Sequence, residues 1–246
     1  MISVIIPTLN EAVKLPLLLD AMAGEKTAHE IIVADGGSTD STVVIAEACG
    51  AGVVQCEPGR GRQLNEGVKV ACGEVLLFLH ADTVFPCGGL AAVASALASN
   101  PDAPGGNFRL LFDGDDGFSR WLEGFYAWIR ARGFYYGDSG IFVRRHVHDR
   151  LGGIRPIALM EDYDLVRRME RAGRTLCISE PTLLTSSRRF HGRRPAAIVA
   201  GWLILHTLYH FGISPDRLAV LYDSMRRRQR KQPAHEPEPL RPQSYS

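Results

Sequence analysis

Residues 30–40, Glu-Ile-Ile-Val-Ala-Asp-Gly-Gly-Ser-Thr-Asp, place an acidic, glycine-rich turn directly after an apolar run of the kind found in strands. Residues 75–83, Val-Leu-Leu-Phe-Leu-His-Ala-Asp-Thr, repeat this arrangement. Short apolar runs are typical of buried parallel strands, and open α/β sheets bind their ligands at the carboxyl ends of such strands. Because both strand ends are acidic, they favour a metal-bound nucleotide over a bare anion as the ligand.

The alternation of apolar runs and helical patterns continues through the first hundred residues. Strands are predicted at 2–6, 30–34, 52–56 and 75–79, and helices at 15–23, 41–49, 63–71 and 90–98. Alternation of this kind predicts right-handed βαβ crossovers and a mostly parallel sheet that is covered on both faces.

The second half of the chain has a mixed pattern. Strands are predicted at 108–112 and 140–143, helices at 118–132 and 161–171, and short extended pieces at 176–178 and 182–185. We expect one domain over 1–195, with a nucleotide-binding half at 1–100 and an acceptor and catalytic half at 101–195. Two helices, 196–213 and 216–228, form a predicted appendage over 196–231. The tail at 232–246, rich in Pro, Glu and Ser, is predicted to be disordered.

Bulk properties narrow the class of protein. A chain of 246 residues with a net charge of +1 has a large enough core for an enzyme, and the charge argues against general nucleic-acid binding. The five cysteines form no CxxC pair, which predicts small core residues in a reducing compartment. Met1 leads directly into a strand with no basic leader, so we expect a cytoplasmic protein.

The first acidic turn contains Asp35, Gly36 and Gly37. The glycines permit a sharp turn and close approach of backbone N–H groups to a ligand, and the carboxylate can accept hydrogen bonds from a base or a ribose. The alternative is a plain strand–turn–helix junction in which Ser38 or Asp40 caps the next helix. If the first two strands are neighbours, the stretch 7–11 brings Thr8, Asn10 and Glu11 beside Asp35.

Asp82 suits Mg²⁺ or Mn²⁺ bound to a diphosphate, because hard cations prefer one or two carboxylates together with phosphate oxygens. A helix cap is the alternative for a lone Asp here. Between the two acidic turns, Arg60 and Arg62 either contact a phosphate or are solvated loop arginines. Residues 59–67 are not a dinucleotide fingerprint, because Leu64 occupies the place of the third glycine, and no Walker A sequence occurs.

Three groups in the second half suit catalysis. Glu161 and Asp162 begin a predicted helix, where the helix dipole favours acidic residues. The stretch 161–164 contains three acids, which is more than a helix cap needs, so one of them can accept a proton from an attacking hydroxyl. Asp138, in the polar turn 137–140, is placed to bind an acceptor hydroxyl. Residues 186–191, Ser-Ser-Arg-Arg-Phe-His, suit a pyrophosphate leaving group.

In this order, these motifs resemble the family 2 glycosyltransferases, which have the GT-A fold. The resemblance covers residues 2–194 and rests on 3–11, on 33–40, on 62–73 leading into the strand that ends at Asp82, and on Glu161 and Asp162 at the family's catalytic-base position. Residues 137–145 and 187–190 are similar to a bacterial branch known as radical-SAM/selenodomain-associated transferases.

The resemblance implies inverting transfer of a sugar from a nucleotide-diphosphate donor to an acceptor hydroxyl, with Asp162 as the general base beside Glu161. Asp82 is then the ligand of Mg²⁺ or Mn²⁺, assisted by His191. Arg188 or Arg189 stabilises the leaving diphosphate, and Asp138 lies on the acceptor side. The implied nucleotide-sugar contacts are Pro7, Thr8, Asn10, Glu11, Asp35, Gly36, Gly37, Arg60, Arg62, Asn65 and Ala81.

Two departures from the family pattern narrow this expectation. His80-Ala81-Asp82 replaces the frequent Asp-x-Asp, so the metal rests on a single carboxylate. Ser187-Arg188-Arg189-Phe190 stands near the place of the Gln-x-x-Arg-Trp motif of processive synthases, which favours addition of one sugar over polymerisation.

Other functions compete with this one. A nucleotidyltransferase shares the broad architecture but needs a glycine-rich N-terminal loop, which residues 8–12 do not offer. A non-catalytic nucleotide-sugar binder would use the same pocket. The apolar segment 196–213 is expected to be buried against the catalytic domain or in a dimer; the alternative is contact with the inner membrane surface and a lipid-linked acceptor.

Overall fold

The computed structural model describes residues 1–114, 117–185 and 195–230. The chain divides into two compact units, Met1–Ser187 and Arg188–Ser246. The predictions for Arg188, Arg189, His191 and the tail 232–246 lie outside the described residues.

In the part of the first unit that the structure describes, the strands form one seven-stranded sheet with the order β3-β2-β1-β4-β6-β5-β7. Only the β4–β6 and β5–β6 pairs are antiparallel, so β6 runs against the other strands. The expected mostly parallel sheet is therefore confirmed. The strands are β1 (Ile2–Thr8), β2 (His29–Asp35), β3 (Gly52–Gln55), β4 (Val75–Phe78), β5 (Gly105–Phe112), β6 (Ile141–Arg144) and β7 (Leu176–Thr185).

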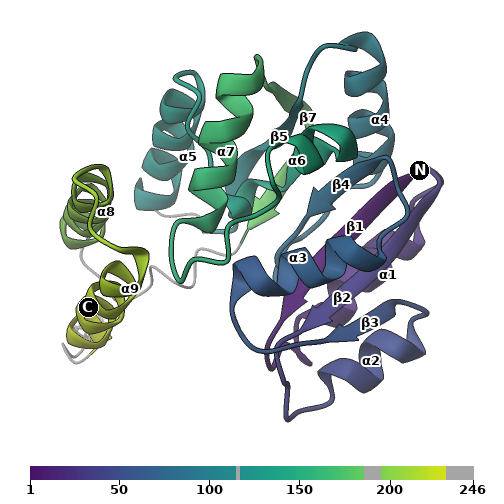
Figure 1. Ribbon diagram of the computed structural model, residues 1–246, viewed down its shortest axis with the longest axis horizontal. Helices are drawn as coiled ribbons and strands as arrows, with labels where there is room; N and C mark the ends of the chain where they lie inside the picture. Colours follow the sequence, from purple (N-terminus) through teal and green to yellow (C-terminus); the bar gives the residue numbers. More distant parts are fainter. Residues whose placement is uncertain (115–116, 186–194, 231–246) are drawn as a thin grey trace, which may run out of the picture. The chain divides into compact units, whose positions relative to one another are not determined.

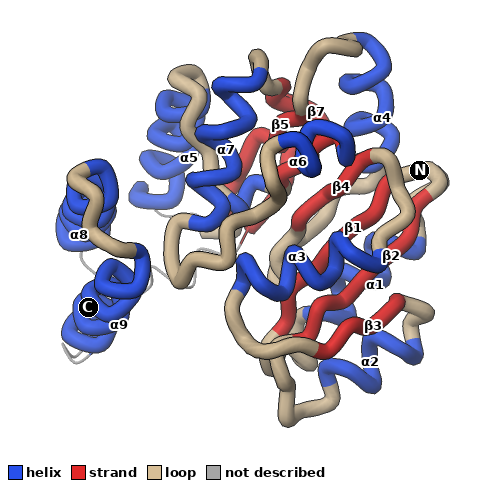
Figure 2. Tube along the Cα trace, in the orientation of Figure 1, coloured by secondary structure: helices blue, strands red, loops and turns tan. Residues whose placement is uncertain are grey.

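Helices cover the sheet on both faces, as Figure 1 and the tube in Figure 2 show. One face carries α3 (Arg60–Val70), α6 (Arg145–Arg150) and α7 (Glu161–Ala172); the other carries α1 (Leu15–Ala23), α2 (Thr42–Ala48) and α4 (Gly89–Ser99). Helix α5 (Gly117–Arg130) packs on β5, and a 3₁₀ turn, η1 (Gly137–Ser139), precedes β6. Layers of this kind bury a parallel sheet, as the apolar runs predict.

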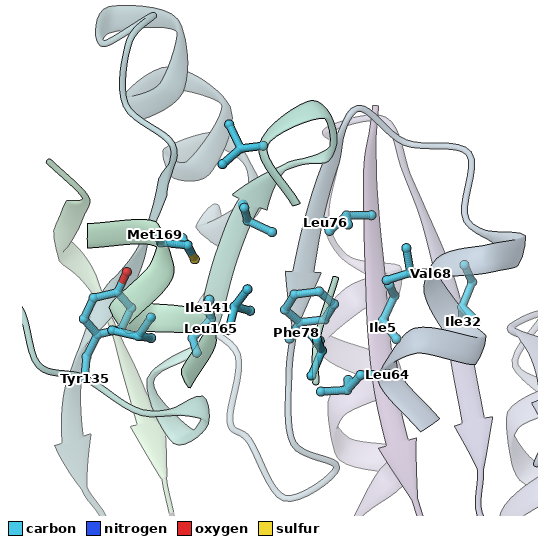
Figure 3. Packing of buried hydrophobic residues seen from close by; sticks show 14 residues of the cluster. Ile5, Ile32, Leu64, Val68, Leu76, Phe78, Tyr135, Ile141, Leu165 and Met169 are labelled. Carbon is cyan, nitrogen blue, oxygen red and sulfur yellow. The ribbon is translucent and has the colours of Figure 1, made fainter. Parts of the chain in front are cut away.

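The core beneath α3 and α7 joins the two halves of the first unit. Leu64 and Val68 of α3 pack over Ile5 of β1, while Leu165 and Met169 of α7 pack near β6 (Figure 3). Gly67 permits the close approach of α3, since a Cβ there would lie 2.5 Å from Cγ2 of Ile5. The predicted nucleotide and acceptor halves therefore share one sheet and one core.

Two sequence predictions are wrong, and one helix has no counterpart among the predicted elements. The pieces 176–178 and 182–185 are one strand, β7, which continues through Glu180 and Pro181 at the edge of the sheet, where a proline is tolerated. Helix α6 was not predicted, because its residues show no apolar period. The cysteines are not core residues: Cys56 is half-buried and the other four are exposed, as Cys49 at the end of α2 illustrates.

The second unit contains two described helices, α8 (Pro195–His210) and α9 (Pro215–Arg230). They pack on one another, with Leu205 and Leu218 buried and with Leu203, Ile204 and Phe211 exposed. Among the described residues, no helix has the length and hydropathy needed to cross a membrane.

Candidate active site

The carboxyl ends of β1 and β4 meet at one edge of the sheet. β1 pairs in parallel with β2 on one side and with β4 on the other, so the strand order reverses beside β1. Open α/β sheets bind ligands in the crevice at such a switch point. Most of the predicted site residues therefore lie around this edge.

Asp35 is buried, and its carboxylate is used by its own turn. Its Oδ1 accepts hydrogen bonds from Thr8 Oγ1 (3.0 Å) and Ser38 Oγ (2.5 Å), and its Oδ2 accepts from the N–H groups of Gly37 (3.0 Å) and Ser38 (2.8 Å). Burial alone would raise the pKa of Asp35, but these hydrogen bonds outweigh it and lower the pKa. Four hydrogen bonds use the capacity of a carboxylate, so the group orders the loop that faces the ligand edge.

The loop after β1 is tied to the same turn. Asn10 adopts a left-handed backbone (φ 57°), donates its N–H to Ser38 Oγ at 2.8 Å and accepts from the Thr39 N–H at 2.9 Å. The N–H of Glu11 donates to Thr42 Oγ1 at 2.8 Å. The first two strand ends thus form one hydrogen-bonded rim.

The two glycines of the turn have different environments. Gly36 is buried, and a Cβ there would lie 3.1 Å from the Gln63 side chain. Gly37 is exposed, has φ 91° and has open space in front of it. Its conformation requires glycine; its N–H is already donated to Asp35, and the open space lies where a Cβ would be.

Gln63 is a site residue that no motif in the sequence singles out. It is buried on α3, and its Nε2 donates to the carbonyl oxygens of Thr8 (2.8 Å) and Ala34 (2.9 Å). The amide therefore joins the ends of β1 and β2 to the start of α3. Its only signal in the sequence is its place in the stretch 59–67.

The basic and amide residues of α3 have partners within the chain. Arg60 Nη1 lies 3.2 Å from Glu161 Oε1, and Arg62 pairs with the exposed Glu57. Asn65 binds the backbone of Ile154 twice, through Nδ2 to the carbonyl oxygen (2.5 Å) and from the Ile154 N–H to Oδ1 (3.1 Å). Asn65 therefore holds the loop that leads to α7.

Asp82 lies beyond the end of β4, with about a third of its side chain exposed, and Ala81 beside it is buried. Lys14 Nζ lies 3.5 Å from Asp82 Oδ2, so a positive charge already occupies space beside the carboxylate. In the described part of the chain, no group of three or more His, Cys, Asp or Glu side chains is placed to hold a metal. This single carboxylate fits a cation that takes most of its ligands from phosphate oxygens and water.

Asp162 faces the same edge from the first turn of α7. Its Oδ2 accepts from the Gly137 N–H at 2.8 Å, and its Oδ1 accepts from the Tyr163 N–H at 2.7 Å. A Cβ at Gly137 would lie 3.1 Å both from Asp162 Oδ2 and from His80 Nε2. The end of β4, the turn η1 and the start of α7 therefore converge on one point.

A cavity of about 20 Å³ confirms this convergence, because Pro7, Arg60, His80, Gly137 and Asp162 all contribute to its wall. Most of its wall is apolar, with Leu64, Phe78 and Ile141 among the lining residues. The cavity connects the end of β1 with the predicted base.

Glu161 is almost fully buried beside Asp162. Burial, and then the negative charge of Asp162, raises the pKa of Glu161 to about 7, while Arg60 acts in the opposite direction. The backbone before it is left-handed at Met160 (φ 70°), which turns the chain sharply into α7. The two neighbouring acids therefore have different environments: Asp162 accepts backbone hydrogen bonds, and Glu161 pairs with an arginine.

Aromatic side chains surround Asp138 and Asp162. Asp138 is buried, and its Oδ2 accepts from Tyr126 Oη at 3.1 Å. Tyr136 stacks on Tyr163 with ring centroids 6.2 Å apart. Burial, and then the charge of Asp162, raises the pKa of Tyr136, so its phenol stays protonated. The sequence singles out the acids here and not these tyrosines.

Comparison with known protein families identifies the family of this chain. Residues 3–155 match the profile of the family described as "Glycosyl transferase family 2". The chain belongs to this family. The match includes Asp35, Asp82 and Asp138 and ends before Glu161 and Asp162, so the family profile does not cover the predicted base.

A curated relative from Mycobacterium tuberculosis, "PGL/p-HBAD biosynthesis glycosyltransferase", is 37% identical over 109 residues, which are 41% of this chain and 43% of the relative. The chain thus matches less than half of that relative's length.

Solved structures share the fold. The glucosyl-3-phosphoglycerate synthase of Mycobacterium tuberculosis, in complex with Mn²⁺, UDP and glucosyl-3-phosphoglycerate, has a TM-score of 0.60 and 20% identity, over 87% of this chain and 80% of that one. The mannosyltransferase PcManGT of Pyrobaculum calidifontis, in complex with GDP-Man and Mn²⁺, has a TM-score of 0.63 and 18% identity, over 92% and 69%. This family 2 chain therefore has the expected GT-A fold.

Proposed function

We propose that this protein is an inverting glycosyltransferase that moves a sugar from a nucleotide-diphosphate donor to an acceptor hydroxyl. The observation that carries the proposal is Asp162, a carboxylate held by two backbone N–H groups at the strand-end crevice of a family 2 chain. In the reaction, the acceptor oxygen forms a bond to the anomeric carbon while its proton passes to Asp162. The bond between the anomeric carbon and the phosphate oxygen breaks, and the nucleoside diphosphate leaves.

The donor binds at the rim made by the β1 and β2 ends. Asp35 and Asn10 hold the turn that carries Gly37, and Thr8 supports this turn through its hydroxyl, which donates to Asp35. Pro7, Glu11, Gly36, Ala81 and the start of α3 complete the walls. Arg60 and Asn65 order these walls through their partners Glu161 and Ile154, and Arg62, whose partner Glu57 is exposed, is the arginine of α3 that contacts a donor phosphate.

Asp82 would hold the divalent cation, which supplies Lewis-acid stabilisation of the diphosphate when it is bound. Lys14, beside Asp82, adds a second positive group toward the leaving diphosphate. The proposal also includes a second metal ligand, His191, and a diphosphate contact from Arg188 or Arg189. It further includes transfer of a single sugar per reaction and membership of the radical-SAM/selenodomain-associated branch.

Turnover of nucleotide sugars by variants tests the proposal. A thermal-shift screen of nucleotide diphosphates with Mn²⁺ identifies the donor base, because ligand binding raises apparent stability. Release of nucleotide diphosphate is then measured for the wild type, Asp162→Asn and Asp82→Ala. We expect Asp162→Asn to bind the nucleotide normally and to lose about 10²- to 10⁴-fold in rate, as for removal of a general base.

Asp102→Asn is the control, since Asp102 is exposed at the opposite end of the sheet, just before β5. It should keep wild-type turnover. We expect Asp82→Ala to lose the increase in nucleotide affinity that Mn²⁺ produces. If the wild type and both site variants bind donor equally and none turns it over, the protein is a non-catalytic binder and the proposal is wrong.

A further inference from the structure

Lys14 and Asp82 come together from two neighbouring strands. Because β1 and β4 pair in parallel, the chain leaves both at the same edge of the sheet, and Lys14 follows β1 while Asp82 follows β4. Lys14 Nζ lies 3.5 Å from Asp82 Oδ2, and the two side chains are 31% and 32% exposed. In the described part of the chain, neither side chain has another charged partner within ion-pair distance. The pair therefore lies at the ligand edge, on the carboxylate proposed to hold the metal.

Lys14 does not stabilise the helix that it precedes. It occupies the N-cap position of α1 and makes no side-chain hydrogen bond to that helix. N-caps are normally Ser, Thr, Asp or Asn, whose side chains accept from free N–H groups, and the positive end of the helix dipole disfavours a cation. The lysine is therefore explained by the carboxylate that it contacts and not by the helix.

The segments on either side of the ion pair are held by other contacts. After β4, the N–H of Thr83 donates to the His80 carbonyl at 3.1 Å, and Val84 and Leu184 exchange backbone hydrogen bonds of 3.0 and 3.4 Å. Helix α1 is anchored by buried apolar side chains, namely Leu15, Leu18, Leu19 and Met22. Loss of the ion pair should therefore alter what binds at this edge and leave the fold intact.

The partner of Asp82 can be exchanged at small cost. Because about a third of each side chain is exposed, water screens the attraction, and ion pairs of this kind stabilise proteins little. A divalent cation carries twice the charge of the ammonium, so the two repel one another at this distance, and a single carboxylate cannot neutralise both. An ammonium released from the carboxylate would remain beside it, free to bind another anion.

We propose that Lys14 and a divalent cation compete for Asp82, and that the Lys14 ammonium binds the diphosphate of the donor when no metal is present. The diphosphate in this statement rests on the proposed function, whereas the competition for Asp82 does not. Lys14 is then a built-in cation, which gives nucleotide binding a component that is independent of metal. When the metal binds, the ammonium leaves the carboxylate and remains a second positive group for the phosphates.

The experiment uses the full chain and the variants Lys14→Met and Lys14→Arg. Lys69→Met is the matched control, since Lys69 also pairs with one carboxylate, that of Glu66, at 2.7 Å on the surface of α3. Calorimetry measures the affinities for UDP, GDP, ADP, CDP and dTDP, each in EDTA and in Mn²⁺. Electron paramagnetic resonance of free Mn²⁺ measures the affinity for the metal alone, and thermal unfolding checks that every variant folds.

We expect the wild type to bind one of these nucleoside diphosphates in EDTA. Lys14→Met should weaken that binding about tenfold, because a charge-assisted contact to phosphate is lost. It should bind Mn²⁺ alone about tenfold more tightly, because the competing charge is gone. The factor by which Mn²⁺ increases nucleotide affinity should therefore rise at least about tenfold above that of the wild type. Lys14→Arg should keep the affinity in EDTA, and Lys69→Met should match the wild type throughout.

Two results would overturn the inference. One is a factor of increase with Mn²⁺ that is equal in the wild type and Lys14→Met, which would make Lys14 a plain phosphate contact or no contact. The other is a wild type that binds nucleoside diphosphate with Mn²⁺ and not in EDTA.

Failure of the proposed function gives different results. If the wild type binds no nucleoside diphosphate in either buffer, the proposed donor is wrong, and the affinities for Mn²⁺ alone still decide the competition. Tighter Mn²⁺ binding by Lys14→Met would then support competition for Asp82, and equal binding would exclude it. Nucleotide binding as expected, with no turnover of any nucleotide sugar, would refute the transferase and keep the role of Lys14.

Discussion

At the residue scale, Gly137 sets the position of the predicted base. Its N–H donates to Asp162 Oδ2, and a Cβ would lie 3.1 Å from that oxygen and from His80 Nε2. We expect Gly137→Ala to lower kcat by about tenfold or more, because a small displacement of a catalytic group is costly. Steady-state kinetics checks this expectation.

Gly124→Ala on α5 is the matched control, since nothing lies within 4 Å of its Cβ. It should leave kcat unchanged and stabilise the helix by about 0.5–1 kcal/mol. Equal activity of Gly137→Ala and the wild type would show that the Asp162–Gly137 contact does not position the base.

The buried carboxyl of Glu161 makes stability depend on pH. Its pKa is raised from 4.5 to about 7, so between these values the folded state keeps a proton that the unfolded state has lost. The stabilisation from the protonated group is complete below the unfolded pKa and is lost as the pH rises through about 7. We therefore expect the free energy of unfolding of Glu161→Gln, measured relative to that of the wild type, to increase by up to about 3 kcal/mol as the pH rises from about 5 to about 8.

Urea unfolding at both pH values measures this difference. Glu66→Gln is the control, because Glu66 pairs with Lys69 on the surface of α3 at 2.7 Å. It should shift stability equally at the two pH values. A Glu161→Gln shift that is also independent of pH would mean that Glu161 is ionised throughout this range.

At the element scale, strands and helices of the first half follow from the apolar pattern. Helix α1 has the predicted bounds, and β1 and β2 extend the predicted strands to Thr8 and Asp35. Patterns of apolar residues report burial, so they identify elements that face a core. They do not report α6, whose polar residues show no period, or the continuation of β7 through Pro181.

The contacts of site residues were less predictable than the elements. The sequence places Asp35 and Asp162 at strand and helix ends, and the structure finds both at the same edge. It does not indicate that the carboxylate of Asp35 is saturated by its own turn and by Thr8, or that Arg60 reaches Glu161. Such pairings depend on side chains that approach from distant parts of the chain, and no local pattern encodes them.

Among the described residues, Asn65 is one of two side chains that hold the backbone of the loop between α6 and α7; the other is Arg168, whose Nη1 donates to the carbonyl oxygens of Leu151 and Gly153. Asn65 makes two hydrogen bonds with the Ile154 backbone, and this loop leads to Glu161 and Asp162. We expect Asn65→Ala to destabilise the protein by about 1–3 kcal/mol, since it leaves two backbone groups unpaired. Chemical denaturation measures this loss, and hydrogen exchange at the Ile154 amide should become faster.

Asn100→Ala is a control for the loss of an amide side chain. Asn100 is exposed at the end of α4, where its Nδ2 bonds to the Ala96 carbonyl at 2.9 Å. Its replacement should cost less than about 0.5 kcal/mol. Unchanged exchange at Ile154 in Asn65→Ala would show that the loop is held by other contacts.

At the scale of the whole molecule, the sheet and the described site residues all lie in the first unit, Met1–Ser187. Family membership rests on residues 3–155, also within that unit. The residues proposed to act on the leaving diphosphate, Arg188 and Arg189, and the proposed metal ligand His191 follow the end of the unit. The chain therefore offers a natural test of their role.

Two fragments, residues 1–187 and 1–191, differ only in Arg188, Arg189, Phe190 and His191. We expect both to fold with the same Tm and to bind the nucleotide, because the core beneath α3 and α7 is complete in each. We expect the longer fragment to turn over the donor about 10²-fold faster, the usual effect of one electrostatic contact to the leaving group. Arg188→Lys in the longer fragment keeps the charge and separates bidentate binding from simple attraction. Equal turnover by the two fragments would exclude these residues from the reaction, and failure of both to fold would show that the first unit depends on the second.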